Sequence, residues 1–316
     1  MSVSETDKSK LLTLVTGATG LVGQSLLARL QRPIVVCRDR ARAGNLLRKC
    51  GEEGSEPSIV EWDSSRGPIL LGSQPQIEAV VNLMGAPIAA RRWTQGYKES
   101  IRASRVDGTK NLIEGLIRAN QLPRVFVSAS AVGIYGDRAD EILTEDSSPG
   151  PSSFLVDVCR AWESEALKLI EHGIRVVILR IGIVISTKGG ALKEMLPIFK
   201  YGLGGRLGNG KQWMSWVHIS DLVQLIEFVL HEEQIKGIVN AVAPHPIRNR
   251  EFAKALGSQL HRPTVLPAPA FGLRLGLGEF ANTLLESQRA IPQRILEAGF
   301  EFRHPDLSAA LAVELA

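Results

Sequence analysis

Residues 11–26 read LLTLVTGATGLVGQSL, and this stretch predicts the class of fold. Leu12 to Val15 form an apolar run typical of a short buried strand, and the apolar residues after position 20 recur at helical spacing. Gly17, Gly20 and Gly23 lie at this junction, where they permit a tight turn, approach to a pyrophosphate and close helix packing. Free N–H groups and the helix dipole favour an anion there. The stretch predicts a dinucleotide-binding turn, with a purely structural glycine turn as the alternative.

The composition narrows the class of protein. Of the 316 residues, 44% are hydrophobic and 22% are charged, as in an ordinary soluble globular protein. The net charge of +4, from 37 basic and 33 acidic residues, is too balanced to favour a nucleic acid or a membrane surface as partner. The three cysteines have no metal-binding spacing, so no metal is expected. The expected partner is a small-molecule substrate.

The start of the chain and its hydropathy bear on location. The first ten residues, MSVSETDKSK, contain no apolar signal core and are not an Arg-rich transit segment. No apolar run approaches the ~20 residues that cross a bilayer. The sparse, odd number of cysteines indicates reduced thiols. We therefore expect a soluble, cytoplasmic protein.

The residues that follow the second predicted strand, Ile34–Cys37, bear on the choice of cofactor. Arg38 comes directly after this strand, and an arginine there accommodates the 2′-phosphate of NADP. Asp39 lies 22 positions after Gly17, within the range of an acid that binds the ribose hydroxyls of NAD. The sequence favours NADP and leaves NAD open. A solvated charge cluster is the alternative for both residues.

The rest of the chain alternates predicted strands and helices, which predicts an α/β fold with a doubly wound parallel sheet. The predicted strands are Ile59–Asp63, Ile77–Met84, Val125–Val127 and Val176–Ile185. The predicted helices are Trp93–Arg118, Phe154–His172 and 221–231, the last with Ser220 or Asp221 as its cap. Residues 41–57 are expected to form a helix and a loop, and the glycine-rich residues 187–216 irregular structure.

Several residues at predicted strand ends are candidates for a site, because strand ends line the crevice of such a sheet. Asp63 would lie beside an adenine, although a turn-forming aspartate is equally consistent. Gly85 would let a dinucleotide pass close to the backbone. Arg105 has small neighbours on its helix face, which allows it to point inward. Ser130 could hold a substrate carbonyl or hydroxyl, or simply cap a turn.

The C-terminal part of the chain adds two kinds of candidate. His218 precedes a predicted helix and could exchange a proton, although a histidine in that place is more often structural. Positive charges in the tail would meet an anionic substrate, with solvated faces as the alternative; they are Arg262, Arg274, Arg289 and Arg294.

Taken together, the chain resembles the extended short-chain dehydrogenase/reductase family, and within it an atypical branch named epimerase family protein or NADP-dependent oxidoreductase-like. The stretches that carry the resemblance are TGATGLVG, NLMGAPI, RRWTQGYKESIRASR, SASAVGIYG, CRAWESEA, GGRLGNGKQWMSWVHISDL, VAPHPIRNREFAKALGSQLHRP and GFEFRHPDLSAAL. The resemblance implies a Rossmann domain over 1–186, joined by 214–245, and a smaller C-terminal substrate lobe over 187–213 and 246–316.

The resemblance also implies a cofactor site and a mode of assembly. The implied cofactor contacts are Gly17, Thr19, Gly20, Leu21, Val22, Arg38, Leu83, Met84, Gly85, Arg105 and Val184. Relatives often form homodimers through the helices that follow strands four and five, here the predicted helices from Trp93 and Phe154. Some relatives in this branch are described as cell-division factors.

One departure from the family bears on chemistry. The family pairs a serine, matched here by Ser130, with a Tyr-x-x-x-Lys motif whose lysine lowers the pKa of the tyrosine. None of the three tyrosines here is followed by lysine four residues on. Substitute acid–base candidates are Tyr135 and His218, with Ser130 orienting the substrate. Arg160 and Glu163 are expected near the cofactor, unless their i, i+3 spacing pairs them with each other.

Three hypotheses follow. The first is a hydride-transferring NADP-dependent oxidoreductase or epimerase with an unknown substrate. The second is a sensor or scaffold that binds NADP(H) without chemistry, in keeping with a cell-division factor. The third is a structural partner that has lost the cofactor, which the intact glycine turn argues against.

Overall fold

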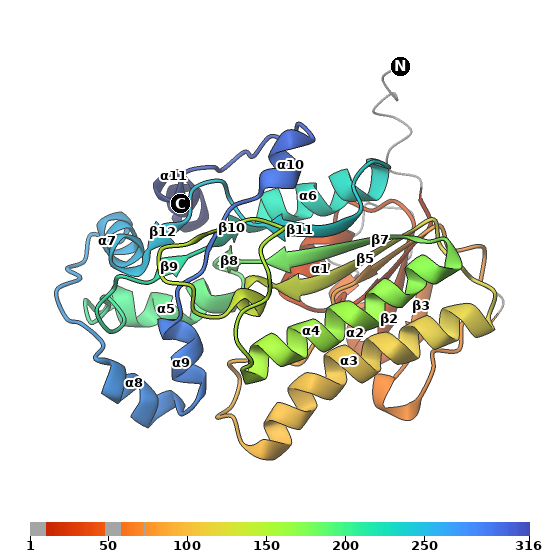
Figure 1. Cartoon of the computed structure of the whole chain (residues 1–316), viewed down its shortest axis with the longest axis horizontal. Helices are drawn as coiled ribbons and strands as arrows, with labels where there is room; N and C mark the ends of the chain where they lie inside the picture. Colours follow the sequence, from red (N-terminus) through yellow and green to blue (C-terminus); the bar gives the residue numbers. More distant parts are fainter. Residues whose placement is uncertain (1–10, 48–57, 73) are drawn as a thin grey trace.

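A parallel sheet organises the structure, a computed structural model that describes residues 11–47, 58–72 and 74–316. Seven strands run in the order β11-β7-β5-β4-β1-β2-β3 (Figure 1). They are β1 (Thr13–Thr16), β2 (Pro33–Cys37), β3 (Ser58–Glu61), β4 (Ala79–Asn82), β5 (Val125–Ala131), β7 (Arg175–Ile181) and β11 (Gly237–Ala241). From β1 the chain adds β2 and β3 on one side and then β4, β5, β7 and β11 on the other, all parallel. The predicted doubly wound, Rossmann-type fold is therefore confirmed.

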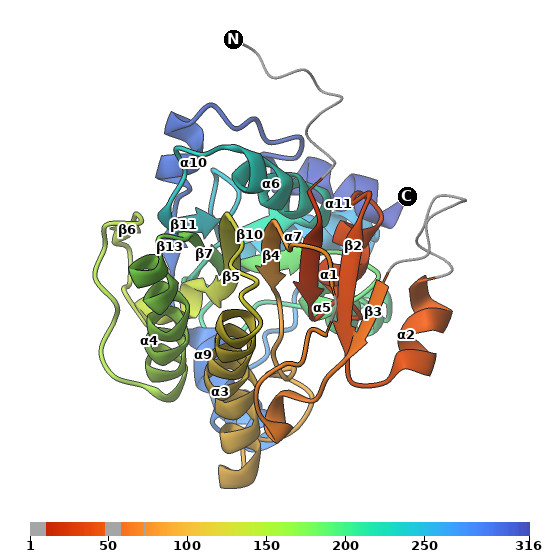
Figure 2. The ribbon, with the colours of Figure 1, turned by 90° about the vertical axis from the view of Figure 1, so that its right-hand side faces the viewer.

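Helices cover both faces of this sheet (Figure 2). α1 (Leu21–Leu27) and α6 (Ile219–His231) pack on one face, where their leucines and valines bury the side chains of β1, β5 and β7. α3 (Gln95–Arg118) and α4 (Phe154–Leu167), the latter followed by a 3-10 turn (Lys168–His172), pack on the other. Strands buried on both faces need continuous apolar runs, and this is why the strands were recognisable in the sequence. α2 (Arg40–Leu47) lies at the β3 edge.

The predicted single strand Val176–Ile185 is wrong, because Gly182 divides it. β7 ends at Ile181 in the main sheet, and β8 (Ile183–Ile185) pairs with β10 (Trp216–His218) instead. A Cβ at Gly182 would lie 2.6 Å from the carbonyl oxygen of Ser215. The backbone therefore passes Ser215 so closely that only glycine fits at position 182. Beyond this crossing the chain leaves the main sheet as β8.

The predicted irregular segment 187–216 contains a helix, α5 (Gly190–Lys200). Leu192, Leu196 and Phe199 share one face and pack into the C-terminal core. This apolar face stabilises the helix despite Pro197 inside it, whereas the many flanking glycines had favoured a loop. The cap of α6 also differs from the prediction, because the side chain of His218, and not that of Ser220 or Asp221, accepts the capping hydrogen bond.

The remaining elements lie mostly towards the C-terminus (Figure 1). Short strands pair β9 (Trp213–Met214) with β12 (Ile247–Arg248), and β6 (Ile142–Leu143) with β13 (Arg289–Ala290). The helices are α7 (Asn249–Gln259), α8 (Ala270–Leu277), α9 (Phe280–Leu285), α10 (Gln293–Glu297) and α11 (Leu307–Leu315). The division into a Rossmann domain and a smaller lobe stays a prediction.

Two sequence predictions fall partly outside the described residues. The helix and loop expected over 41–57 are described only to residue 47, and the N-terminal segment expected to carry no signal lies before residue 11. Within the described ranges, no helix is both long and apolar enough to span a membrane. The cytoplasmic location stays a prediction.

Candidate functional site

The glycine turn between β1 and α1 has the geometry of an anion site. Gly17 has a φ of +67°, and a Cβ there would lie 2.4 Å from the carbonyl oxygen of Leu83. A Cβ at Gly23 would lie 2.4 Å from the oxygen of Gly17, so glycine lets α1 begin directly against the turn. Gly20 caps the helix without a side-chain hydrogen bond. The N–H groups of Leu21 and Val22, in the first turn, have no acceptor within the helix and suit a phosphate.

Gly17→Ala should therefore lower both stability and cofactor affinity. The substitution places a side chain at positive φ and into the Leu83 carbonyl, and such strain costs about 1–3 kcal/mol before the clash is counted. We expect a lower urea midpoint and weaker NADPH binding in a fluorescence titration. Gly44→Ala, where a Cβ would meet nothing within 4 Å, is the matched control. If the two variants had the same urea midpoint and the same NADPH affinity, this account of the turn would be contradicted.

The end of β2 presents a free positive charge next to this turn. Arg38 is exposed, and within the described part of the chain its guanidinium makes no hydrogen bond or ion pair. Arg40, by contrast, donates to the carbonyl oxygen of Ile59 at 2.7 Å. Asp39 is exposed as well. Arg38 is thus available to a ligand phosphate, and its contact with NADP stays a prediction.

Asp63 caps a short 3-10 helix, Ser64–Arg66, so its role as a turn former is observed. Its carboxylate accepts from the backbone N–H of Ser65 at 3.0 Å and from the Ser65 hydroxyl at 2.8 Å. These hydrogen bonds hold the pKa of Asp63 below its usual range, and the charges of Arg66 and Arg38 act in the same direction. A contact between Asp63 and an adenine stays a prediction.

Arg105 points inward, towards the end of β4. Its Nη1 donates to the carbonyl oxygens of Ala86 at 3.0 Å and Ile101 at 3.2 Å, and a Cβ at Gly85 would lie 2.8 Å from its Cζ. Burial lowers the pKa of this guanidinium. Among the described residues no carboxylate forms an ion pair with it. Such a half-buried cation beside Gly85, at the end of a central strand, suits an anionic ligand, and its contact with a cofactor stays a prediction.

The other predicted cofactor contacts surround the same strand ends. The Thr16 hydroxyl donates to Asn82 Oδ1 at 2.7 Å, which ties the end of β1 to the end of β4. Leu83 and Met84 follow directly and are half-buried, and so is Val184 on β8. Thr19 is exposed in the glycine turn. The fold therefore gathers these residues around one edge of the sheet, and their contacts with a cofactor stay predictions.

Ser130 belongs to a buried network at the end of β5. Its hydroxyl donates to Glu163 Oε1 at 2.6 Å. Both oxygens of Glu163 also accept from Arg180, at 3.0 Å from Nε and 2.9 Å from Nη2. Arg180 Nη1 donates to the hydroxyl of Tyr135 at 3.0 Å, and that hydroxyl lies 2.8 Å from Asn240 Oδ1. Three strands and α4 thus meet in one buried chain of hydrogen bonds.

Sequence reasoning missed Arg180 altogether. Glu163 pairs with this residue and not with Arg160, which donates to the carbonyl oxygen of Gly150 instead. The available signal was an arginine inside the apolar run VVILRIGIVI, since an arginine in a strand buried on both faces needs a carboxylate partner. Glu163 follows Cys159 by four residues, the spacing that a Tyr-x-x-x-Lys pair would have.

Tyr135 and Cys159 are poorly placed to exchange protons. The side chain of Tyr135 is fully buried, its hydroxyl contacts three polar partners, and burial raises its pKa. Burial also raises the pKa of the Cys159 thiol to about 12. Both groups therefore stay protonated at neutral pH. The role of Tyr135 as an acid–base residue stays a prediction.

His218 lies at a different junction, where it caps α6. Its Nδ1 accepts from the backbone N–H of Ser220 at 3.3 Å and lies 2.7 Å from the Ser220 hydroxyl. Its Nε2 lies 3.3 Å from Glu314 Oε1, and its ring lies 4.1 Å from that of His304. Burial lowers the pKa of His218, and the charge of His304 adds to this effect. The hydrogen bonds described for His218 do not join it to the Ser130 network.

The four tail arginines all have partners in the structure. Arg262 donates to the carbonyl oxygen of Lys200, Arg274 to Asn282, and Arg294 forms an ion pair with Asp146 at 2.6 Å. Arg289 stacks on Trp213, 4.4 Å from the ring centroid. An anionic substrate stays a prediction that these contacts do not favour.

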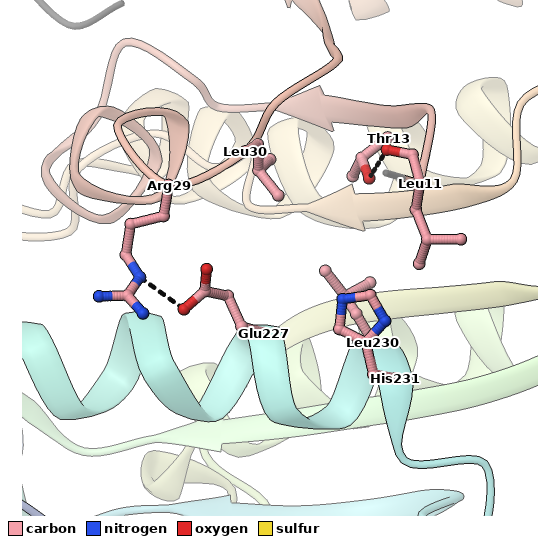
Figure 3. A pocket seen from close by; sticks show the side chains of 7 residues that line it. All are labelled: Leu11, Thr13, Arg29, Leu30, Glu227, Leu230 and His231. Atoms are coloured by element: carbon pink, nitrogen blue, oxygen red, sulfur yellow. Dashed lines mark hydrogen bonds and ion pairs between the residues drawn. The ribbon is translucent and has the colours of Figure 1, made fainter. Parts of the chain in front are cut away.

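One pocket lies away from all of these residues (Figure 3). It opens at the amino end of β1, between α1 and α6, and an ion pair between Arg29 and Glu227 crosses it. It is lined by Leu11, Thr13, Arg29, Leu30, Glu227, Leu230 and His231. Cofactors bind at the carboxyl ends of parallel strands, so this pocket belongs to the opposite edge of the sheet.

Comparison with known proteins places the glycine turn and the sheet in a family. The model of the NAD dependent epimerase/dehydratase family matches residues 13–241. The chain belongs to this family. A second model, a domain of unknown function (DUF1731), matches residues 268–313.

Relatives of this epimerase/dehydratase chain are similar over nearly their whole length. The epimerase family protein SDR39U1 homolog, chloroplastic, of Arabidopsis thaliana is 39% identical over 310 residues, covering 98% of this chain and 88% of that protein. The epimerase family protein Mb2239 of Mycobacterium bovis is 37% identical over 298 residues, covering 94% and 95%. The predicted resemblance to the epimerase family branch is therefore confirmed.

Solved structures also resemble this chain in fold. The human epimerase family protein SDR39U1 (isoform 2), crystallised with NADPH, is 32% identical with a TM-score of 0.83, covering 95% of this chain and 98% of that one. MoeE5 in complex with UDP-glucuronic acid and NAD is 21% identical with a TM-score of 0.72, which shows the shared fold alone. Chains of this fold have thus been solved with NADPH and with NAD.

Proposed function

We propose that this chain binds NADPH across the carboxyl edge of its sheet. The observation that carries the proposal is the Arg38 guanidinium, which lies at the end of β2 beside the Gly17 turn and has no hydrogen-bond or ion-pair partner among the described residues. An arginine at this place suits a 2′-phosphate. The inward-facing Arg105 would neutralise the pyrophosphate, and the free N–H groups of Leu21 and Val22 would donate to it. The human relative crystallised with NADPH supports this choice over NAD.

We further propose that the chain is an oxidoreductase with a substitute for the Tyr/Lys pair. A bound nicotinamide would supply the hydride chemistry. Ser130 would orient a substrate hydroxyl, and its own proton already lies on a 2.6 Å hydrogen bond to the Glu163 carboxylate. Glu163 would accept that proton as the hydroxyl proton passes to Ser130. The substrate is a small molecule of unknown identity.

A non-catalytic NADPH sensor is the second candidate, and one observation favours it. Arg180 donates to both oxygens of Glu163, so this carboxylate is already engaged in a buried ion pair. In that case NADPH binding would change the affinity of this chain for a partner protein, and no substrate would be oxidised or reduced.

An activity assay separates the oxidoreductase from the sensor. The protein is mixed with NADP(H) and each of a panel of small alcohols and carbonyl compounds, and the absorbance of reduced nicotinamide is followed. An oxidoreductase should turn over at least one compound, and Ser130→Ala should abolish this turnover while NADPH binding persists. Tyr135→Phe should retain turnover, because the buried hydroxyl serves the network and not the substrate. Turnover that survives Ser130→Ala, or is absent with every compound, would overturn the oxidoreductase proposal.

A further inference from the structure

The C-terminal helix α11 reaches the cofactor edge of the sheet through one side chain. Glu314 lies one residue before the end of this helix, which packs beside α7 and β8 (Figure 1). Its Oε2 accepts from the backbone N–H of Thr187 at 2.6 Å and from the Thr187 hydroxyl at 3.1 Å. Its Oε1 lies 3.3 Å from His218 Nε2. One half-buried carboxylate therefore joins α11 to the ends of both β8 and β10.

The segment held by Glu314 lies directly over the start of α1. A Cβ at Gly189 would lie 3.4 Å from the side chain of Leu21, and so would a Cβ at Gly190. Leu21 is the first residue of α1, and its N–H belongs to the anion site of the glycine turn. Residues 187–190 thus form a short bridge between Glu314 and the cofactor turn.

The surrounding polar groups suit a carboxylate at position 314. His218 Nδ1 accepts from the backbone N–H of Ser220, so the ring proton of neutral His218 lies on Nε2 and faces Glu314. Thr187 presents two further donors to the same side chain. A carboxylate accepts from both Thr187 donors and presents its second oxygen to His218, whereas an amide would turn its own N–H donors towards His218 or Thr187.

We infer that Glu314 is a positioning residue for the cofactor site: it fixes the 187–190 segment against Leu21 and so preorganises the glycine turn for a phosphate-bearing ligand. This inference rests on the proposed binding of NADPH. It also gives His218 a structural role, as the cap of α6 whose Nε2 lies 3.3 Å from Glu314 Oε1.

Glu314→Gln should raise the dissociation constants of NADPH and NADH by the same factor, about tenfold, because the loss of a charge-assisted hydrogen bond loosens the common phosphate site. Glu301→Gln, at an exposed position just before α11, makes the same chemical change and should leave both constants unaltered. Thr187→Val, which keeps the backbone bond and removes the hydroxyl, should give a smaller effect in the same direction.

Hydrogen exchange provides a readout that does not depend on the cofactor. In Glu314→Gln the amide of Thr187 and those of residues 188–190 should exchange faster than in the wild type, with the α3 amides unchanged. A lower melting temperature with wild-type NADPH affinity and wild-type exchange at 187–190 would overturn the inference and leave Glu314 a purely structural residue. If the wild type itself binds no NADPH while exchange at 187–190 rises in the variant, the proposed function fails and the link between Glu314 and this segment stands.

Discussion

Arg38→Ala should weaken NADPH binding by roughly tenfold to a hundredfold and leave NADH binding within about twofold, since one charge-assisted hydrogen bond to a phosphate is lost. Only NADPH carries the 2′-phosphate, and Arg38, at the end of β2, is exposed and makes no ion pair with any residue that the structure describes. Fluorescence titration of each variant with NADPH and with NADH measures both constants.

Two neighbouring arginines serve as controls for this result. Arg40→Ala should change neither constant, because its guanidinium is already bound to the Ile59 carbonyl. Arg105→Ala should weaken both cofactors by a similar factor, since the pyrophosphate is common to them. An unchanged NADPH affinity in Arg38→Ala, together with weaker NADH binding in Asp39→Ala, would make Asp39 the determinant and NAD the cofactor.

Arg180→Met should lower the free energy of unfolding by about 3–5 kcal/mol, because it leaves the buried Glu163 carboxylate without its partner. Both side chains are under one-tenth exposed, so water cannot replace the lost hydrogen bonds. The same change also removes a donor to Tyr135. Urea unfolding of wild type and variant, monitored by circular dichroism, gives the difference.

The matched control and the double variant make this prediction specific to the buried pair. Arg118→Met removes an exposed i, i+4 ion pair with Glu114 and should cost less than about 1 kcal/mol. Arg180→Met combined with Glu163→Leu removes both charges and should recover much of the lost stability. A cost for Arg180→Met no larger than that for Arg118→Met would show that the pair does not stabilise the fold.

The sequence supported the main sheet well because its strands are buried on both faces. Val177 and Val127 lie in strands whose apolar runs need no tertiary information to recognise. The break at Gly182 was hidden, since it depends on the backbone of Ser215, far along the chain. α5 was missed because its flanking glycines outweighed a three-residue apolar face in a local reading.

The candidate site was predictable only where it depends on local pattern. Gly17 and Arg38 follow directly from a strand, a turn and the next strand end. The partner of Glu163 lies on another strand, and the contact between His218 and Glu314 joins residues almost a hundred positions apart. Such pairs have no spacing rule, so only the three-dimensional structure brings them together.

The most direct test of the account is a fluorescence titration of the wild-type protein with NADPH and, separately, with NADH. We predict saturable binding of NADPH at a dissociation constant at least about tenfold below that for NADH, because Arg38 adds one phosphate contact. Binding of neither cofactor, or tighter binding of NADH, would contradict the assignment of the Gly17 turn and Arg38 as an NADPH site.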